Sequence, residues 1–176
     1  VWDRGNNNLT NSNLVEQTYE NGYVDENGDP VRVLSRDPVN YVGGEFGWFF
    51  ELPDNGERSV TNPVVRGGIV FFNSFVPVDD PCSVGGFGFR FAVDIINGGT
   101  PDEVAIDTNN DGVIDEKDKA TNATGTAASI TAIRQEGFLP EPVFIEDIAY
   151  TAETPSKVQG LKEPPTGRFS WQELLQ

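Results

Sequence analysis

The sequence contains no histidine, no methionine and only one cysteine. The lack of histidine excludes histidine general bases, triads built on histidine, and histidine metal ligands. The lone Cys82 cannot form a disulfide within the chain, so it is either a buried apolar residue or the partner of a cysteine elsewhere. Because no methionine is present and the chain begins at Val1, we expect a piece of a longer protein or a processed chain.

Basic residues are also scarce, with 12 Lys and Arg against 28 Asp and Glu, for a net charge of −16. This balance argues against binding to a nucleic-acid backbone or to an anionic membrane surface. The sequence has neither an apolar run long enough to span a membrane nor a signal peptide. We therefore predict no nucleic-acid partner and no membrane insertion, and we favour a cation-binding protein or one working in a calcium-rich medium.

Glycine, proline and phenylalanine are plentiful, with 19, 12 and 12 copies in 176 residues. This composition predicts short strands joined by turns. Strand-like segments cover 47–52, 58–65, 69–75 and 87–93, and Gly, Pro, Asp or Asn turns separate them. Phe87, Phe89 and Phe91 alternate with small or polar residues, which is the period of a strand. The predicted fold is all-β, with antiparallel meander blades that form part of a β-propeller.

Beyond residue 100 we expect further strands over 127–133 and 143–150, then a proline-rich linker. Ser170 and Glu173 form a capping box, and Trp171 with Leu174 lies at helical spacing, which predicts a short C-terminal helix docked on the sheet. The expected division is a polar strand and turn segment (1–46), blade-like strands (47–100), a calcium-loop insertion (101–126), the last strands (127–154), and the linker with the terminal helix (155–176).

The dodecapeptide D-T-N-N-D-G-V-I-D-E-K-D over 107–118 is the strongest motif in the chain. Its spacing is that of an EF-hand calcium loop, with Gly112 at the sharp turn. Four carboxylates so close together would repel one another without a cation. The alternative is a surface turn, since Asp, Asn and Gly favour turns. We predict calcium as the ligand, held by Asp107, Asn109, Asp111, the Val113 carbonyl, Asp115 and Asp118.

The last position of this loop departs from a sensor EF-hand, because Asp118 stands where a bidentate Glu is usual. The shorter side chain favours either a tighter loop or coordination by Asp115 in its place. An opening switch of the calmodulin type is therefore not expected, and a single copy among strands does not fit a dockerin. Asp25, Asn27 and Asp29 repeat only the first half of the pattern, and we interpret that stretch as a hairpin turn around Asn27-Gly28, with a weak ion site as the alternative.

The ordered series GWFFELP, GERSVTNPVVRGGIVFFNSFVP, DPCSVGGFGFRFAVDI and DTNNDGVID closely resembles the C-terminal β-propeller region of the PilY/PilC group. These are type IV pilus tip-associated biogenesis factors and adhesins. VWDRG at the start and GRFSWQELLQ at the end also resemble that region, and the visible chain then corresponds to late blades and the extreme C-terminus.

The resemblance implies an extracellular location, at the pilus tip or outer cell surface. It implies contacts with minor pilins, with the upstream part of the same polypeptide, and with a host or abiotic surface. The family's calcium loop matches Asp107, Asn109, Asp111, Val113 and Asp115, and it is implicated in controlling pilus extension against retraction. No Arg-Gly-Asp triplet is present, so integrin binding is not expected. Cys82 matches the family's cysteine.

Two other functions are considered, a structural subunit of a cell-surface polymer and a carbohydrate-acting enzyme. Glu45, Glu51 and Glu57 are candidate carboxylates for glycoside hydrolysis, but nothing in the sequence aims one at another. Trp48 and Phe49 offer faces for sugar stacking, although their apolar strand favours core packing. We predict no enzyme, no catalytic residues and no cofactor other than calcium.

Overall fold

The computed structural model describes residues 10–78, 85–145, 148–150 and 156–157. Within these ranges the chain is all-β, and its helical pieces are two 3-10 turns, η1 (Asn11–Asn13) and η2 (Glu116–Asp118). No helix in this part of the chain is long and apolar enough to cross a membrane. Cys82 and the predicted C-terminal helix lie outside the described residues. The strands are β1 (Val15–Glu16), β2 (Tyr19–Glu20), β3 (Val33–Leu34), β4 (Trp48–Phe49), β5 (Arg58–Ser59), β6 (Val64–Arg66), β7 (Ile69–Pro77), β8 (Gly86–Asp94), β9 (Ala120–Thr121), β10 (Ala127–Ala128), β11 (Ala132–Glu136), β12 (Val143–Ile145), β13 (Ile148–Tyr150) and β14 (Ser156–Lys157).

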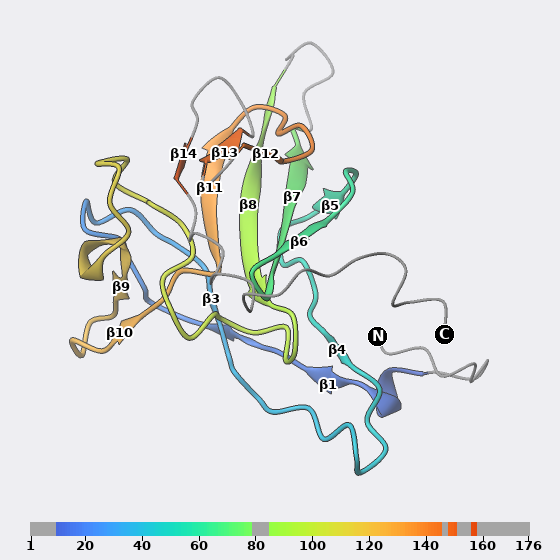
Figure 1. Ribbon diagram of the computed structural model, residues 1–176. Coiled ribbons are helices and arrows are strands. Elements are labelled where there is room, and N and C mark those ends of the chain that lie inside the picture. The colour runs from blue at the N-terminus through green and yellow to red at the C-terminus, as the bar shows by residue number, and fades with distance from the viewer. Residues whose placement is uncertain (1–9, 79–84, 146–147, 151–155, 158–176) are drawn as a thin grey trace, which may run out of the picture.

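A five-stranded antiparallel sheet forms the centre of the molecule (Figure 1). β7 and β8 pair along their whole length, β11 pairs with the other edge of β8, and β5 and β6 both pair with β7. This confirms the strands expected at 69–75 and 87–93. The strand expected over 58–65 is divided into β5 and β6, and Pro63 between them has no backbone N–H to give to a ladder. Among the described strands the sheet is open, because no ladder joins β11 to β5.

The two faces of this sheet are covered by different parts of the chain. On one, which we call the loop face, Ile69, Phe71 and Ala92 pack against Ala105 and Ile106, which lead into the predicted calcium loop. On the other, which we call the aromatic face, the core is built from residues that alternate with those. The aromatic face carries Phe72, Val76, Phe87, Phe89, Phe91 and Ala132, with Phe50 and Leu52 packed on them.

Short two- and three-residue strands surround the central sheet. β1 runs parallel to β4, β2 pairs with β3, β9 with β10, and β12, β13 and β14 form a small antiparallel sheet. The strand predicted over 143–150 is thus two paired strands, and the one over 127–133 is divided between β10 and β11. The predicted turn around Asn27-Gly28 is present, closed by an antiparallel bridge between Val24 and Pro30.

Candidate functional site

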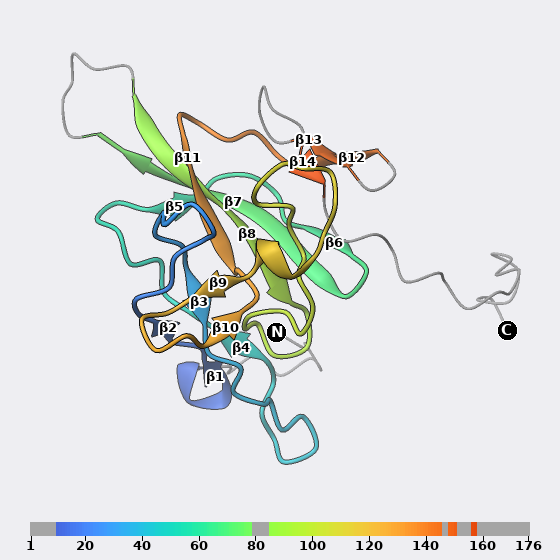
Figure 2. The same cartoon turned by 90° about the vertical axis from the view of Figure 1, so that its left-hand side faces the viewer.

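The predicted calcium loop begins directly at the loop face of the sheet (Figure 2). Ala105 and Ile106 are each 1% exposed and fix the chain just before Asp107, which is itself buried. At the other end η2 leads into β9, whose Ala120 is fully buried. Both ends of the loop are therefore anchored in the core, while its middle reaches solvent.

The sharp turn of the loop lies at the predicted glycine. The Gly112 N–H donates to Asp107 Oδ2 at 2.9 Å, and Gly112 has a φ of +82°. This left-handed conformation favours glycine. The first half of the loop is thereby closed around the carboxylate of Asp107, as a cation-binding turn of this type requires.

The side chains in the middle of the loop accept hydrogen bonds from their own backbone. Asn109 Oδ1 accepts from the Asp111 N–H at 2.9 Å, and Asp111 Oδ1 accepts from the Val113 N–H at 2.8 Å. Asp115 Oδ1 caps η2 by accepting from the Lys117 N–H at 2.8 Å. Across the described ranges, no group of three or more His, Cys, Asp or Glu side chains is gathered for a metal ion. The turn is formed, whereas the acids do not converge.

Asp118 has a different environment from the other acids, because its side chain is fully buried. Its Oδ1 accepts from Thr108 N at 2.7 Å, Thr108 Oγ1 at 3.0 Å and Asn109 N at 3.4 Å, and its Oδ2 accepts from Asp115 N at 3.0 Å. Three of these donors reach Oδ1 and one reaches Oδ2, so both oxygens of the carboxylate are engaged within the loop. Asp118 ties the two ends of the loop together.

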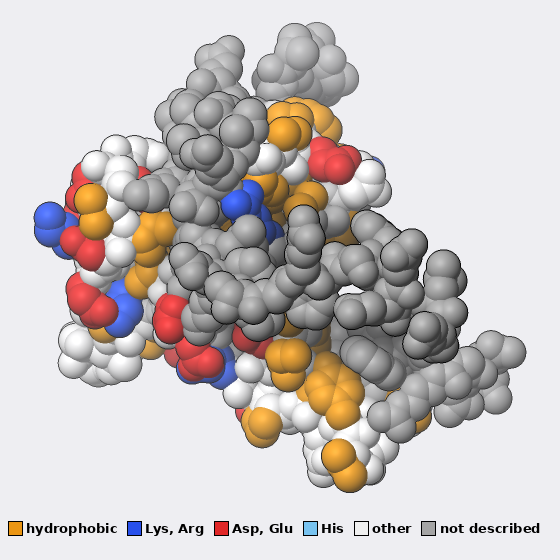
Figure 3. Space-filling view, in the orientation of Figure 1, with side chains coloured by type: hydrophobic (Ala, Val, Ile, Leu, Met, Phe, Trp, Pro, Cys, Tyr) orange, Lys and Arg blue, Asp and Glu red, His pale blue; other side chains and the backbone are white. Residues whose placement is uncertain are grey.

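The donor chemistry of the loop fits a hard cation, since every predicted ligand offers oxygen and none offers nitrogen or sulfur. Asp111 and Asp115 each accept two hydrogen bonds, which leaves both carboxylates with further acceptor positions. Acidic side chains, interspersed with basic ones, lie on the side of the molecule where the loop and β9 are found (Figure 3). Within 107–118 the acids outnumber the basic residues by five to one, which favours the approach of a cation.

Sequence reasoning missed Arg90, which lies in β8 opposite Asn73 and Ile133. Its side chain belongs to the loop face and is 3% exposed. Burial lowers the pKa of Arg90 to about 10, and the neighbouring charge of Asp107 acts in the opposite direction. No clear signal in the sequence marked it, because the neighbours of Arg90 are Phe89 and Phe91 and only the alternate residues Gly88 and Ala92 are small.

A second arginine, largely enclosed with its side chain 11% exposed, lies on the aromatic face. Arg32 donates to both oxygens of Glu57 at 2.8 and 2.9 Å and to Asp54 at 3.1 Å. Its guanidinium also lies 3.3 Å from the centroid of the Phe89 ring. Glu57, a candidate hydrolytic carboxylate from the sequence, is thus held by a structural ion pair and also accepts from the Ser74 hydroxyl.

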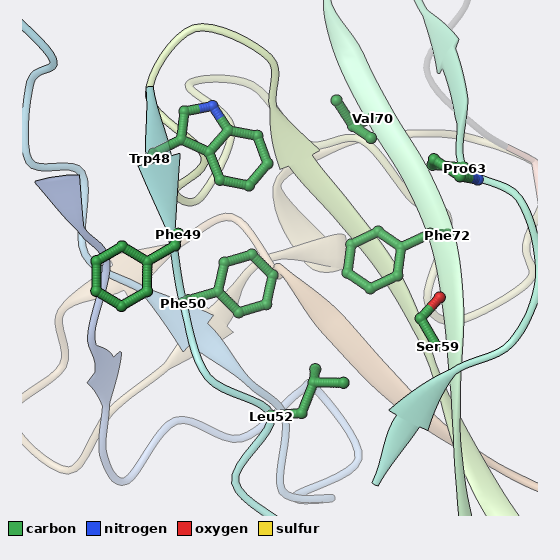
Figure 4. Close-up of a pocket in the computed structure, with 8 residues that line it drawn as sticks. All are labelled: Trp48, Phe49, Phe50, Leu52, Ser59, Pro63, Val70 and Phe72. Carbon is green, nitrogen blue, oxygen red and sulfur yellow. The ribbon is translucent and has the colours of Figure 1, made fainter. Parts of the chain in front are cut away.

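An apolar hollow of about 410 Å³ lies beside the aromatic face (Figure 4). Trp48 and Phe50 point toward Phe72 on β7, while Phe49 points away from them. The rings of Trp48 and Phe50 are stacked with centroids 6.1 Å apart, and Trp48 Nε1 donates to the Ile95 carbonyl at 3.1 Å. These rings are engaged with the protein itself. The lining is Trp48, Phe49, Phe50, Leu52, Ser59, Pro63, Val70 and Phe72.

A polar cavity of about 420 Å³ separates the turn at 25–30 from the predicted calcium loop. Asp25 Oδ1 accepts from the N–H groups of Asn27 and Asp29, at 2.9 Å each, so this turn stabilises itself. Thr108 and Asn110 of the loop line the opposite wall, and Arg90 lies in the wall formed by the sheet. The cavity gives one side of the loop an opening to solvent.

Comparison with known proteins identifies relatives of the chain, although no protein-family model matches it. The type IV pilus biogenesis factor PilY1 of Pseudomonas aeruginosa strain PAO1 is 27% identical over 136 residues, which are 70% of this chain and 12% of that protein. A PilY1 homolog of Xylella fastidiosa is 27% identical over 182 residues, which are 97% of this chain and 14% of that protein.

The fold has a solved counterpart. The crystal structure of the Pseudomonas aeruginosa PilY1 C-terminal domain superposes with a TM-score of 0.71 at 18% identity, over 86% of this chain and 32% of that one. The chain therefore spans only about an eighth of the relatives it matches and a third of the solved domain. The resemblance seen in the sequence is confirmed: this chain is related to the PilY1 type IV pilus biogenesis factors, in their C-terminal region.

Proposed function

We propose that this chain is a calcium-binding module of an extracellular assembly factor and adhesin associated with the type IV pilus. The bound ion stabilises the fold and takes part in the choice between pilus extension and retraction and in surface attachment. The names of the curated relatives support the pilus role and a non-enzymatic activity. The observation that carries the calcium assignment is the loop itself, with its left-handed Gly112 bonded to Asp107.

The proposed ligands are side-chain oxygens of Asp107, Asn109, Asp111 and Asp115, together with the Val113 carbonyl. The sequence also predicted Asp118, but the four hydrogen bonds that it accepts favour a role in closing the loop. In this arrangement Asp115 supplies the last ligand in its place. The ion would draw the acids together and offset their mutual repulsion.

The propeller fold, the external partners and the location are part of the same proposal. The meander of β6, β7, β8 and β11 supports the prediction that the central sheet is one blade of a propeller. Its neighbours would then come from the upstream part of the same polypeptide. Minor pilins and a host or abiotic surface are the proposed external partners, at the pilus tip or outer cell surface.

Calorimetric titration with calcium tests the site. We expect the wild type to bind calcium with a dissociation constant of about 0.1–1 mM, as extracellular modules do. The double variant Asp107→Ala/Asp111→Ala should lose the binding heat. The matched control is Asp25→Ala/Asp29→Ala, which removes the same number of acids from the facing turn and should leave the binding curve unchanged.

Thermal unfolding in calcium and in chelator gives a second readout. Calcium at a hundredfold excess over its dissociation constant adds about 2.7 kcal/mol of stability if it binds only the folded chain. Equal melting temperatures in calcium and chelator, together with an unchanged titration in the double variant, would overturn the assignment.

A further inference from the structure

β11 forms one edge of the central sheet, with β8 on its inner side (Figure 1). On its outer side Ala132 exchanges two backbone hydrogen bonds with Arg32, at 3.0 and 3.1 Å. The bonding groups of an antiparallel strand alternate between its two sides from one residue to the next. The N–H and C=O groups of Arg134 and Glu136 therefore point outward, as those of Ala132 do.

A proline stops the neighbouring segment from extending this ladder along β11. The bridge between Arg32 and Ala132 is antiparallel, so two positions further along each chain its register sets Pro30 opposite Arg134. Pro30 has no N–H to donate, and it bridges back within its own turn instead. Within the described ranges, no other segment bonds the backbone of Arg134 or Glu136 on this outer side.

The polar cavity of about 420 Å³ lies along this open edge. Arg134, Gln135 and Glu136 of β11 line it, as do Asp25 and Asp29 of the neighbouring turn. Its volume is within the range of about 300–1,000 Å³ that is usual for binding sites. The Oε1 of Gln135 is buried and has no hydrogen-bond partner among the described residues, so a donor on an incoming side chain would satisfy it.

We propose that β11 accepts an extended, basic segment of another polypeptide as a further strand of the sheet. In this mode of recognition the main-chain hydrogen bonds supply affinity, and pockets for alternate side chains supply specificity. The backbone groups of Arg134 and Glu136 bond the segment, and the cavity receives one of its side chains. This inference goes beyond the calcium site and does not depend on it.

The charge around the cavity selects the kind of segment. The stretch 20–29 contains four acids and no Lys or Arg. On β11 the guanidinium of Arg134 is already paired with Glu136 at 2.9 Å, and the other arginine of the lining, Arg90, is 3% exposed. Basic side chains on the incoming strand thus meet accessible carboxylates, whereas acidic ones are repelled. The net charge of −16 attracts the same class of segment at longer range.

Hydrogen exchange with a generic basic peptide tests the proposal. The probe is acetyl-(Thr-Lys)4-amide. The controls are acetyl-(Thr-Glu)4-amide and the basic peptide with every backbone nitrogen methylated, which has no N–H to donate. In the free protein the amides of Arg134 and Glu136 should exchange rapidly. At a concentration about tenfold above its dissociation constant, the probe should slow both amides about tenfold, and neither control should slow them.

Two substitutions at one position separate the backbone from the side chain. Arg134→Pro removes the outward N–H at an edge position, where proline is tolerated. Arg134→Thr removes the same side chain and keeps the N–H. The dissociation constant of the basic peptide should be about tenfold higher for Arg134→Pro than for Arg134→Thr. Equal constants would overturn the proposal. The exchange experiment on the wild type needs neither variant to fold.

Asp25→Asn/Asp29→Asn tests the charge of the turn beside β11. Asparagine keeps the Oδ1 acceptor that Asp25 offers to its own turn, so the variant loses charge and keeps the turn. Its dissociation constant for the basic peptide should rise about fivefold. The matched control is Glu16→Gln/Glu51→Gln, which removes two exposed acids outside the cavity and should stay within about twofold. An unchanged constant in the aspartate variant would refute the preference for a basic segment.

Other occupants of the edge give different results. Slow exchange of Arg134 and Glu136 in the free monomer would show that this chain covers its own edge. Protection that grows with protein concentration would show that a second copy binds there. Either result overturns the proposal. Peptide binding without calcium binding would leave this inference standing while the calcium proposal fails, and calcium binding without peptide binding would refute this inference alone.

Discussion

The two faces of the central sheet each bury an arginine, but they compensate it in different ways. On the aromatic face, Arg32 has both oxygens of Glu57, an oxygen of Asp54 and the ring of Phe89. On the loop face, Arg90 is 3% exposed, and the charge of Asp107, the first residue of the loop that we propose to hold calcium, favours its charged form. The groups around Arg32 are all structural. Asp107, which lies on the side of Arg90, is also a proposed calcium ligand.

This difference in charge compensation indicates which interactions stabilise each face. The aromatic face also stacks Phe72 on Phe91, with ring centroids 4.6 Å apart and planes at 7°, and it needs no external group. The loop face ends in a segment whose Asn and Asp side chains accept hydrogen bonds from their own turn. We therefore expect the aromatic face to be insensitive to calcium and the loop face to depend on it.

The largest effect should come from the ion pair on the aromatic face. Glu57→Gln removes one of the two acids that compensate Arg32 and leaves Asp54 as its partner, so the cost should lie near the lower end of the about 3–5 kcal/mol for breaking a buried pair. The loss should be the same in calcium and in chelator, as measured by urea unfolding. Glu51→Gln, at an exposed position, is the control and should change stability little. A calcium-dependent loss in Glu57→Gln would break the distinction between the faces.

An intermediate effect is expected at the turn of the loop. Gly112 has a φ of +82°, and a Cβ there would meet no atom within 4 Å. Gly112→Ala therefore costs only the backbone strain of the left-handed conformation, about 1–2 kcal/mol. Because calcium binding needs that turn, the variant should lose affinity in calorimetry as well as stability. Gly125→Ala, at the same φ in another exposed turn, should lose stability alone.

The sequence predicted the parts of the fold in which pattern and turn chemistry agree. The period of two in 87–93 and the apolar run at 69–75 became β8 and β7, and Asn27-Gly28 became a turn. Short strands carry too few residues for a period, so the parallel pairing of β1 with β4 was not foreseen. The eight-residue segment 143–150 gave no sign of where the chain reverses between β12 and β13.

In the candidate site too, the feature that is local in sequence was predicted and the residues brought in from distant segments were not. The spacing of 107–118 located the loop because its acids are close in sequence, and that assignment remains a prediction about calcium. Arg90 lies 17 positions before Asp107, and Arg32 lies 25 positions before Glu57. Such pairs form only when the sheet brings distant segments together. No local pattern in the sequence marks them.

The smallest effect at neutral pH is expected at Tyr19, which adjoins Arg32 on the aromatic face. Its ring lies 5.6 Å from the guanidinium, and burial raises the pKa of Tyr19 above its ordinary value of 10.0. A raised folded-state pKa gives stability that is complete below pH 10 and is lost as the pH rises toward the folded value.

Tyr19→Phe removes this ionisation, so the variant should lose less stability than the wild type when urea midpoints are followed from pH 8 to pH 11. The same series in calcium and chelator should give parallel curves, because Tyr19 lies on the aromatic face. Tyr41→Phe is the comparison, since burial also raises the pKa of Tyr41 but its hydroxyl donates to the Ile96 carbonyl outside the arginine cluster. If Tyr19→Phe and the wild type lose stability equally above pH 10, the aromatic face is open to water at Tyr19. Arg32 would then be less enclosed than its partners indicate.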